Sequence, residues 1–211
     1  MSSALHRRLL VCLALSAGAA CAADIDRPDV HVGDRWNWQH TNVLANESDF
    51  TLIEDVVEVG DSEIRARVRT KGKAGSNIAT YTREWNPVDV VFARYQPDLR
   101  SYAFPLHVGA KWEGSADKLL FSNGKHGRFN LAGEVQALEK VTVPAGTFEA
   151  YKVSLVLEAT STDEDANVGH TTELFWYAPS VRRYVKLENT FSRDGRVRSQ
   201  DRYELTEFSL R

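Results

Sequence analysis

The chain has 211 residues, 43% of them hydrophobic and 26% charged, so it is long and apolar enough to bury a core of its own. Its 29 acidic residues outnumber its 26 basic ones, and the net charge of −3 leaves no basic excess for a nucleic-acid partner. The only two cysteines, Cys12 and Cys21, lie near the N-terminus, so the predicted fold does not depend on disulfides.

Residues 1–22 are predicted to be a secretory signal peptide. A basic stretch at residues 6–8 precedes an apolar run at residues 9–17, which is too short to span a bilayer as a helix. Ala20-Cys21-Ala22 then supplies the small residues that signal peptidase requires, and cleavage is expected after Ala22. We therefore expect an exported protein, located in the periplasm, whose mature chain is residues 23–211.

Cys21 admits a second interpretation, as the acylated first residue of a lipoprotein. Gly18 stands where lipoprotein signals usually carry leucine, which disfavours a lipid anchor. After the signal, no apolar run is long enough for a transmembrane segment.

Beyond the signal, apolar and polar residues alternate with a period of two, which is typical of β-strands. Residues 64–69, Ile-Arg-Ala-Arg-Val-Arg, alternate strictly, and the segment from Tyr151 to Leu157 does so as well. Turn residues such as Asn123-Gly124 and Asp194-Gly195 separate these runs. No segment sustains a helical period, although residues 115–121 could form a short helix.

Several motifs occur twice in the same order, which indicates an internal repeat. Residues 31–36, His-Val-Gly-Asp-Arg-Trp, recur as His-Val-Gly-Ala-Lys-Trp at 107–112. The strand–turn–strand pattern at 57–64 likewise matches 141–148. We predict repeat halves at about 31–96 and 106–211, joined by residues 97–105.

These observations predict an all-β fold, a single domain over residues 23–211, shaped as a curved antiparallel sheet or half-barrel formed by two repeated β-meanders. One half by itself would expose sheet edges and an apolar face, so both halves are expected to share one core.

The second half resembles the TapB-like family of secreted bacterial proteins of unknown function. The resemblance rests on Pro-Leu-His-Val-Gly-Ala-Lys-Trp at 105–112, Val-Pro-Ala-Gly-Thr-Phe at 143–148 and Trp-Tyr-Ala-Pro at 176–179. Residues 180–183 depart from the glycine-rich stretch that relatives often have. The resemblance implies a half-barrel similar to periplasmic lipoprotein carriers, and it brings no catalytic residues.

Five tryptophans are the main candidate site residues, because indole rings could line an apolar cavity within a curved sheet. They are Trp36, Trp38, Trp85, Trp112 and Trp176. For most of them, burial in the core is the simpler interpretation.

Other candidate sites are weaker, and no catalytic, cofactor or metal site is predicted. His31 and His107 occupy equivalent repeat positions without the further ligands that zinc needs. Residues 163–169 place carboxylate or amide oxygens at alternate positions, but Val168 stands where an EF-hand requires glycine and Leu174 where it requires glutamate. Arg65, Arg67 and Arg69 could form an anion-binding stripe, although an exposed charged strand face explains them equally well. No hydrolase or phosphate-binding motif is present.

Three functions remain open. The first is a periplasmic binding or carrier module for an apolar small molecule, and the second is a module that binds another envelope protein. The third is a hydrolase with dispersed carboxylates such as Glu84 and Glu173, which a buried pair of acids in a cleft would favour. We expect a protein that is not an enzyme, and its oligomeric state stays open.

Overall fold

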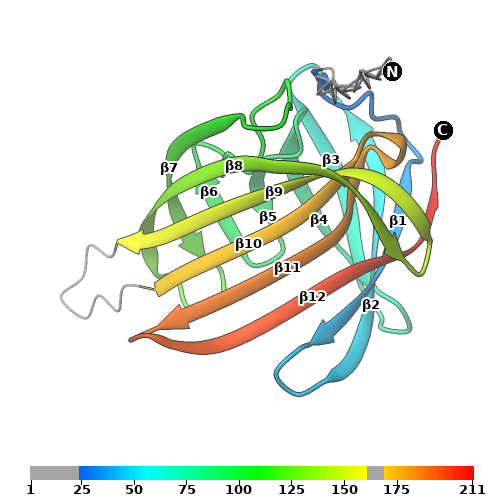
Figure 1. The fold of residues 1–211 in the computed structure, drawn as a ribbon. Coiled ribbons are helices and arrows are strands. Elements are labelled where there is room, and N and C mark those ends of the chain that lie inside the picture. The colour runs from blue at the N-terminus through cyan, green and yellow to red at the C-terminus, as the bar shows by residue number, and fades with distance from the viewer. Residues whose placement is uncertain (1–23, 161–168) are drawn as a thin grey trace, which may run out of the picture.

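The structure, a computed structural model, describes residues 24–160 and 169–211, which form twelve strands and one short 3-10 helix (Figure 1). The predicted signal peptide with Cys21, and residues 163–168 of the acidic segment, lie outside the described residues. The elements are β1 (Arg35–Asn42), β2 (Glu47–Val59), β3 (Glu63–Thr70), β4 (Asn77–Thr82), β5 (Pro87–Val90), β6 (Ala93–Gln96), β7 (Lys111–Leu120), β8 (His126–Val143), β9 (Gly146–Thr160), β10 (Gly169–Ala178), η1 (Pro179–Val181), β11 (Arg183–Arg193) and β12 (Arg196–Ser209).

Every strand pairs antiparallel with its neighbours in the chain, which confirms the all-β antiparallel prediction. The sheet is closed, however, whereas an open curved sheet or half-barrel was expected. β1 pairs with β12 from Arg35–Ser209 to Asn42–Asp201, and this ladder completes a barrel. Closure satisfies backbone groups that two open edges would leave unpaired.

The helix allowed at residues 115–121 is absent, because residues 115–120 form the end of β7 and Phe121 begins the following turn. Ala116 faces the core together with Trp112, as the period of a strand requires. Among the described residues, no helix is long and apolar enough to cross a membrane.

The alternation at residues 64–69 places the apolar side chains of β3 in the core and its arginines outside. Ile64, Ala66 and Val68 are buried. On the outer face Arg65 contacts Glu58 at 2.8 Å and Arg69 contacts Asp55 at 3.0 Å, both from β2. The arginines therefore join neighbouring strands, and two of the three are already paired with carboxylates.

The two copies of the repeated motif have the same local geometry. Gly33 and Gly109 have φ angles of +95° and +89°, and their N–H groups donate to the carbonyls of Val56 at 3.0 Å and Val135 at 2.8 Å. A positive φ explains why glycine stands at both positions. The duplication of a whole half-chain, and the single-domain assignment, stay predictions.

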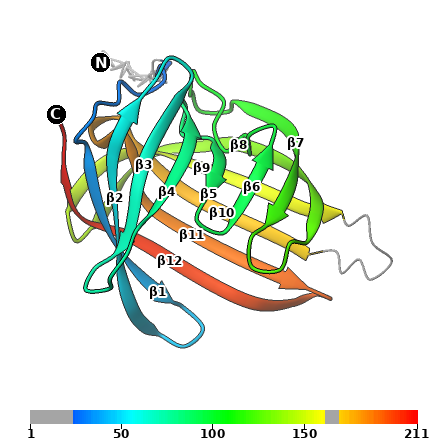
Figure 2. The ribbon, with the colours of Figure 1, turned by 180° about the vertical axis from the view of Figure 1, so that it is seen from behind.

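The connections between strands alternate between the two ends of the barrel. One end, here called the open end, carries the β1–β2, β3–β4, β5–β6, β7–β8 and β11–β12 hairpins. The other, the closed end, receives residues 24–34 and the linker 97–110, which pair through Ile25 and Leu106. The C-terminus lies at this end as well (Figures 1 and 2).

Gly133 on β8 permits close packing of the Trp112 indole, and a substitution at this glycine tests that contact. A Cβ atom at position 133 would overlap the indole of its cross-strand partner Trp112. We expect Gly133→Ala to lower the free energy of unfolding by about 1–3 kcal/mol because the indole must move. Urea denaturation measures this.

The matched control is Gly114→Ala on the neighbouring strand β7, where the nearest atoms would be 3.5 Å away. That variant should unfold close to wild type. Equal stability of the two variants would contradict the proposed packing of Trp112.

Candidate functional site

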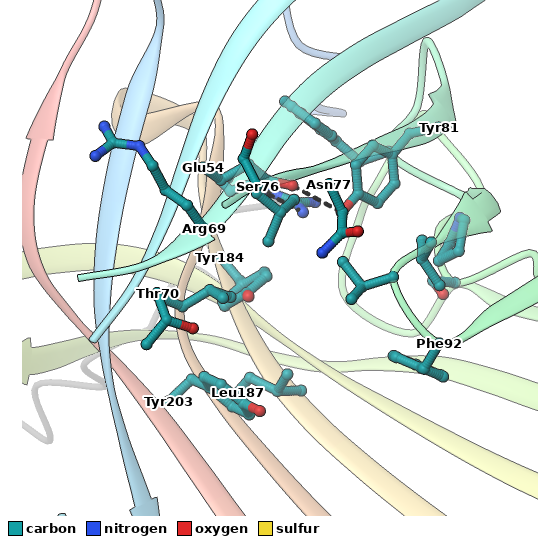
Figure 3. Close-up of a pocket in the computed structure, with 18 of the residues that line it drawn as sticks. Glu54, Arg69, Thr70, Ser76, Asn77, Tyr81, Phe92, Tyr184, Leu187 and Tyr203 are labelled. Carbon is teal, nitrogen blue, oxygen red and sulfur yellow. Dashed lines mark hydrogen bonds and ion pairs between the residues drawn. The ribbon is translucent and has the colours of Figure 1, made fainter. Parts of the chain in front are cut away.

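A cavity of about 700 Å³ lies inside the barrel. The β3–β4 hairpin, through residues 73–76, and the β5–β6 turn, through Val91 and Phe92, contribute to its lining, so it reaches the open end. Figure 3 shows residues from β2, β3, β11 and β12 around it. Its volume is in the range of pockets that hold small molecules.

Most of the lining is aromatic or aliphatic. The apolar and aromatic residues are Phe50, Leu52, Val68, Ala74, Tyr81, Trp85, Pro87, Val90, Val91, Phe92, Tyr95, Leu99, Tyr102, Phe175, Tyr184, Leu187 and Tyr203. The polar and charged residues are Glu54, Arg69, Thr70, Lys73, Ser76, Asn77, Ser101, Glu173 and Arg183, with Gly75 completing the set.

A tryptophan cluster fills the barrel beside the cavity. Trp36 stacks on Trp38 and meets Trp85 edge-on, with ring centres 5.5 Å apart in the second pair. The three indole N–H groups donate to the backbone carbonyls of residues 181, 184 and 182 at 2.9, 3.2 and 3.0 Å. Large rings can be buried here because each polar edge has an acceptor.

Of the five candidate tryptophans, Trp85 lines the cavity and the other four do not. Trp36 and Trp38 are fully buried in the cluster just described. The indole of Trp112 donates to the carbonyl of Arg100 at 2.9 Å. Trp176 faces the side of β10 opposite Phe175, where it donates to Glu139 at 2.6 Å and lies beneath Lys186.

A buried ion pair lies between the tryptophan cluster and the cavity. Nε and Nη2 of Arg183 donate to Oε2 of Glu54 at 3.2 and 3.0 Å, and Tyr81 donates to Oε1 at 2.7 Å (Figure 3). The guanidinium also covers the ring of Trp85 at 4.0 Å. Burial alone would lower the pKa of Arg183, but the Glu54 carboxylate and the surrounding tyrosines together raise that pKa above its ordinary value, so the arginine stays charged.

Glu173 is a second carboxylate on the cavity wall, in a different environment. It accepts a hydrogen bond from Asn189 at 3.0 Å, and among the described residues no cation lies within ion-pair distance of it. Burial raises the pKa of Glu173, against the opposing effects of Asn189 and Lys118. The pKa of Lys118 is lowered by burial, and its ammonium lies 4.7 Å from the ring centre of Phe129.

Tyrosine hydroxyls supply several of the neutral polar groups of the cavity. Burial raises the pKa of Tyr95, Tyr102 and Tyr184, and it raises the pKa of Tyr203 to about 12 with help from Asp201 and Asp49. All four are therefore protonated at physiological pH. They can donate hydrogen bonds to a ligand.

His40 lies next to the cavity, stacked on Phe50 with ring centres 4.4 Å apart. Its Nδ1 contacts Asp49 and its Nε2 lies 3.1 Å from Asp201. The hydrogen bond from His40 lowers the pKa of Asp49. Within residues 24–160 and 169–211, no group of three or more histidines, cysteines and carboxylates is arranged to hold a metal ion.

Sequence reasoning missed Glu54, Arg183 and the tyrosines, and it named Glu173 only as one dispersed carboxylate. The sequence contained one signal that could have identified Glu173 as a residue of the cavity wall. Glu173 occupies the same face of β10 as Phe175 and Tyr177, where an apolar residue would be expected.

The comparisons with known proteins identify the fold alone. No family model and no curated protein matches the chain. A predicted lipoprotein from Parabacteroides distasonis has a similar structure, with a TM-score of 0.57 and 18% identity over 89% of this chain and 100% of that one. A predicted exported protein with a YmcC-like fold from Bacteroides fragilis gives 0.54 and 16%, over the same shares.

The chain is similar in fold to these two proteins. The similarity is consistent with the barrel described above, and it assigns neither a ligand nor a reaction, because one fold serves many functions. The resemblance to the TapB-like family stays a prediction.

The buried ion pair generates a stability prediction. Arg183→Met leaves the Glu54 carboxylate buried without its cation, and we expect it to lower the free energy of unfolding by about 3–5 kcal/mol. Arg65→Met, which removes the exposed partner of Glu58, should change it by less than about 0.5 kcal/mol. Denaturant unfolding of both variants tests this, and equal effects would show that Arg183 is not held as described.

Glu173 generates a prediction about pH. Because the pKa of Glu173 is raised, the folded protein binds a proton at this carboxyl more readily than the unfolded chain does. The free energy of unfolding therefore falls as pH rises from the ordinary pKa of a glutamate through the raised pKa of Glu173. We expect Glu173→Gln to be more stable than wild type at pH 7. The difference should shrink as pH falls below the ordinary pKa of a glutamate. Thermal melts across pH measure it, and a difference independent of pH would contradict the burial of this carboxyl.

Proposed function

We propose that the protein is an exported binding module that holds a ligand with an apolar body inside the barrel. The observation that carries this proposal is the cavity of about 700 Å³, which is lined mainly by aromatic and aliphatic side chains and reaches the open end. Transfer of apolar ligand surface from water to such a lining is favourable, by about 25 cal/mol per Å². The predicted signal peptide and the fold of the two similar proteins support export.

The polar groups of the cavity suit a ligand with one polar part. Tyr95 and Tyr102 are buried on the wall, and both have their pKa raised by the nearby Glu173 carboxylate as well as by burial. Hydroxyl donors and a carboxylate acceptor therefore line the same cavity. A few convergent polar groups in an apolar pocket orient a ligand and give specificity.

The hydrolase hypothesis draws on the two carboxylates of the same cavity, Glu54 and Glu173. Both oxygens of Glu54 are occupied, Oε1 by Tyr81 and Oε2 by Arg183. A carboxylate held in this way is poorly placed to attack a substrate or to accept a proton from water. We therefore favour binding over catalysis, with no cofactor.

Filling the cavity tests the proposal. Leu187 lines the cavity, whereas Val156 is half-exposed on the outer face of β9. We expect Leu187→Trp to weaken binding of the apolar fluorescent probe N-phenyl-1-naphthylamine by about tenfold or more, since the added ring occupies ligand volume. Val156→Trp should bind like wild type, and a fluorescence titration compares the three proteins.

Native mass spectrometry of protein purified from the periplasm, followed by solvent extraction, examines the natural ligand. A bound amphiphile released by the solvent is the expected result. A clean apo mass, together with no probe binding by wild type, would refute the proposed function.

A further inference from the structure

The charged residues of the cavity wall differ in whether they have a counter-ion. Within the described chain, those that line the cavity are Glu54, Arg69, Lys73, Glu173 and Arg183. Glu54 and Arg183 bind each other, and Arg69 lies 3.0 Å from Asp55. Lys73 is exposed on the β3–β4 hairpin, where bulk solvent hydrates its charge. Glu173 is therefore left as the interior charge without a counter-ion.

The Glu173 side chain lies on the inner face of β10. It shares that face with Phe175, which also lines the cavity, and its cross-strand neighbours are Leu155 on β9 and Asn189 on β11. Asn189 donates to Oε1 at 3.0 Å, and no described residue donates to Oε2. One oxygen of a carboxylate on the cavity wall can therefore accept a hydrogen bond from a ligand.

Lys118 is the described cation whose charge acts on Glu173, and it does not satisfy the carboxylate. Its charge lowers the pKa of Glu173, but burial raises that pKa by more. The two groups form no ion pair, because the ammonium lies among three aromatic rings instead. The ring centres of Phe92, Tyr95 and Phe129 are 5.5, 5.5 and 4.7 Å from it. A partly desolvated carboxylate in this situation favours a further cation in the cavity.

Aromatic rings of the same cavity favour a cation over an anion. Tyr95, Tyr102 and Phe175 all line the cavity, and the rings of Tyr102 and Phe175 meet edge to face, 4.9 Å apart. Ring faces carry partial negative charge and attract cations. The rings around Lys118 show that the interior of this barrel already accommodates one ammonium in this way. An anionic headgroup at the depth of Glu173 would instead be repelled by its carboxylate.

We propose that the ligand of the cavity is a cationic amphiphile, with its apolar chain inside the barrel and an ammonium group at Glu173. This inference rests on the proposed function and adds the charge of the ligand to it. The ammonium donates to Oε2, the oxygen that no described residue binds. A charge-assisted hydrogen bond is about twice as strong as a neutral one, so an alcohol with the same chain is a weaker ligand.

Competition against the neutral probe N-phenyl-1-naphthylamine tests the charge of the ligand. Decylammonium, 1-decanol and decyl sulfate share one chain length and carry a positive, a neutral and a negative headgroup. Each is titrated, below its critical micelle concentration, into the complex of the purified protein with the probe at pH 8, where an alkylammonium is charged. We expect wild type to bind decylammonium at least about tenfold more tightly than 1-decanol, and to bind decyl sulfate most weakly.

The test variant is Glu173→Gln, which keeps the size of the side chain and removes its charge. The matched control is Glu158→Gln, which removes the same charge from an exposed position on the outer face of β9. We expect the preference for decylammonium over 1-decanol to be lost in the test variant and kept in the control. Both variants should bind the probe like wild type, which shows that the cavity is intact.

Two results would overturn the assignment of a cationic ligand while the probe still binds and the cavity function stands. One is equal competition by decylammonium and 1-decanol in wild type, or a preference that survives in Glu173→Gln. The other is tighter binding of decyl sulfate than of decylammonium, which would show that a cation such as Lys73 selects the headgroup. If wild type did not bind the probe, the proposed function itself would fail, and the ligand assignment with it.

Discussion

Pairing of β1 with β12 closes the sheet, and this closure decides what the interior can hold. A barrel of eight strands is just wide enough for side chains to fill, whereas twelve strands enclose more space than one layer of side chains occupies. The extra volume is divided between the two ends. Trp36, Trp38 and Trp85 fill the interior on one side, and the cavity occupies the other.

The linker between the predicted repeat halves contributes to this division. Leu99, Ser101 and Tyr102 are buried and line the cavity from the closed end. The Asn86 side chain holds this segment, accepting from the N–H of Tyr102 at 2.7 Å and donating to its carbonyl at 3.2 Å. A segment that joins two halves in the sequence therefore becomes part of the wall of the candidate site.

Arg183 lies between the tryptophan cluster and the cavity. Its guanidinium lies over Trp85 on one side and binds Glu54, which lines the cavity, on the other. Because this charge pair is internally satisfied, it adds polarity to the cavity without requiring a charged ligand. Glu173, the tyrosine hydroxyls and other polar lining residues such as Asn77 and Ser101 are left as the groups that can select a ligand.

Local patterns in the sequence predicted the strands well. The alternation at residues 64–69 and at 151–157 placed the correct side chains inside, because a pleated strand sends successive residues to opposite faces. The repeated His-Val-Gly motif likewise marked two turns of the same geometry. Residues 115–121 were ambiguous, since a short segment can satisfy either period until its neighbours pair with it.

The sequence by itself determined that the described chain is antiparallel β-structure with tryptophan-rich inward faces. Only the tertiary structure decided that the sheet closes, that Trp85 alone among the five tryptophans faces the cavity, and that Glu54 meets Arg183 across 129 residues of chain. The reason is physical: alternation depends on adjacent residues, whereas closure, cavity volume and the pairing of distant charges depend on how twelve strands pack together.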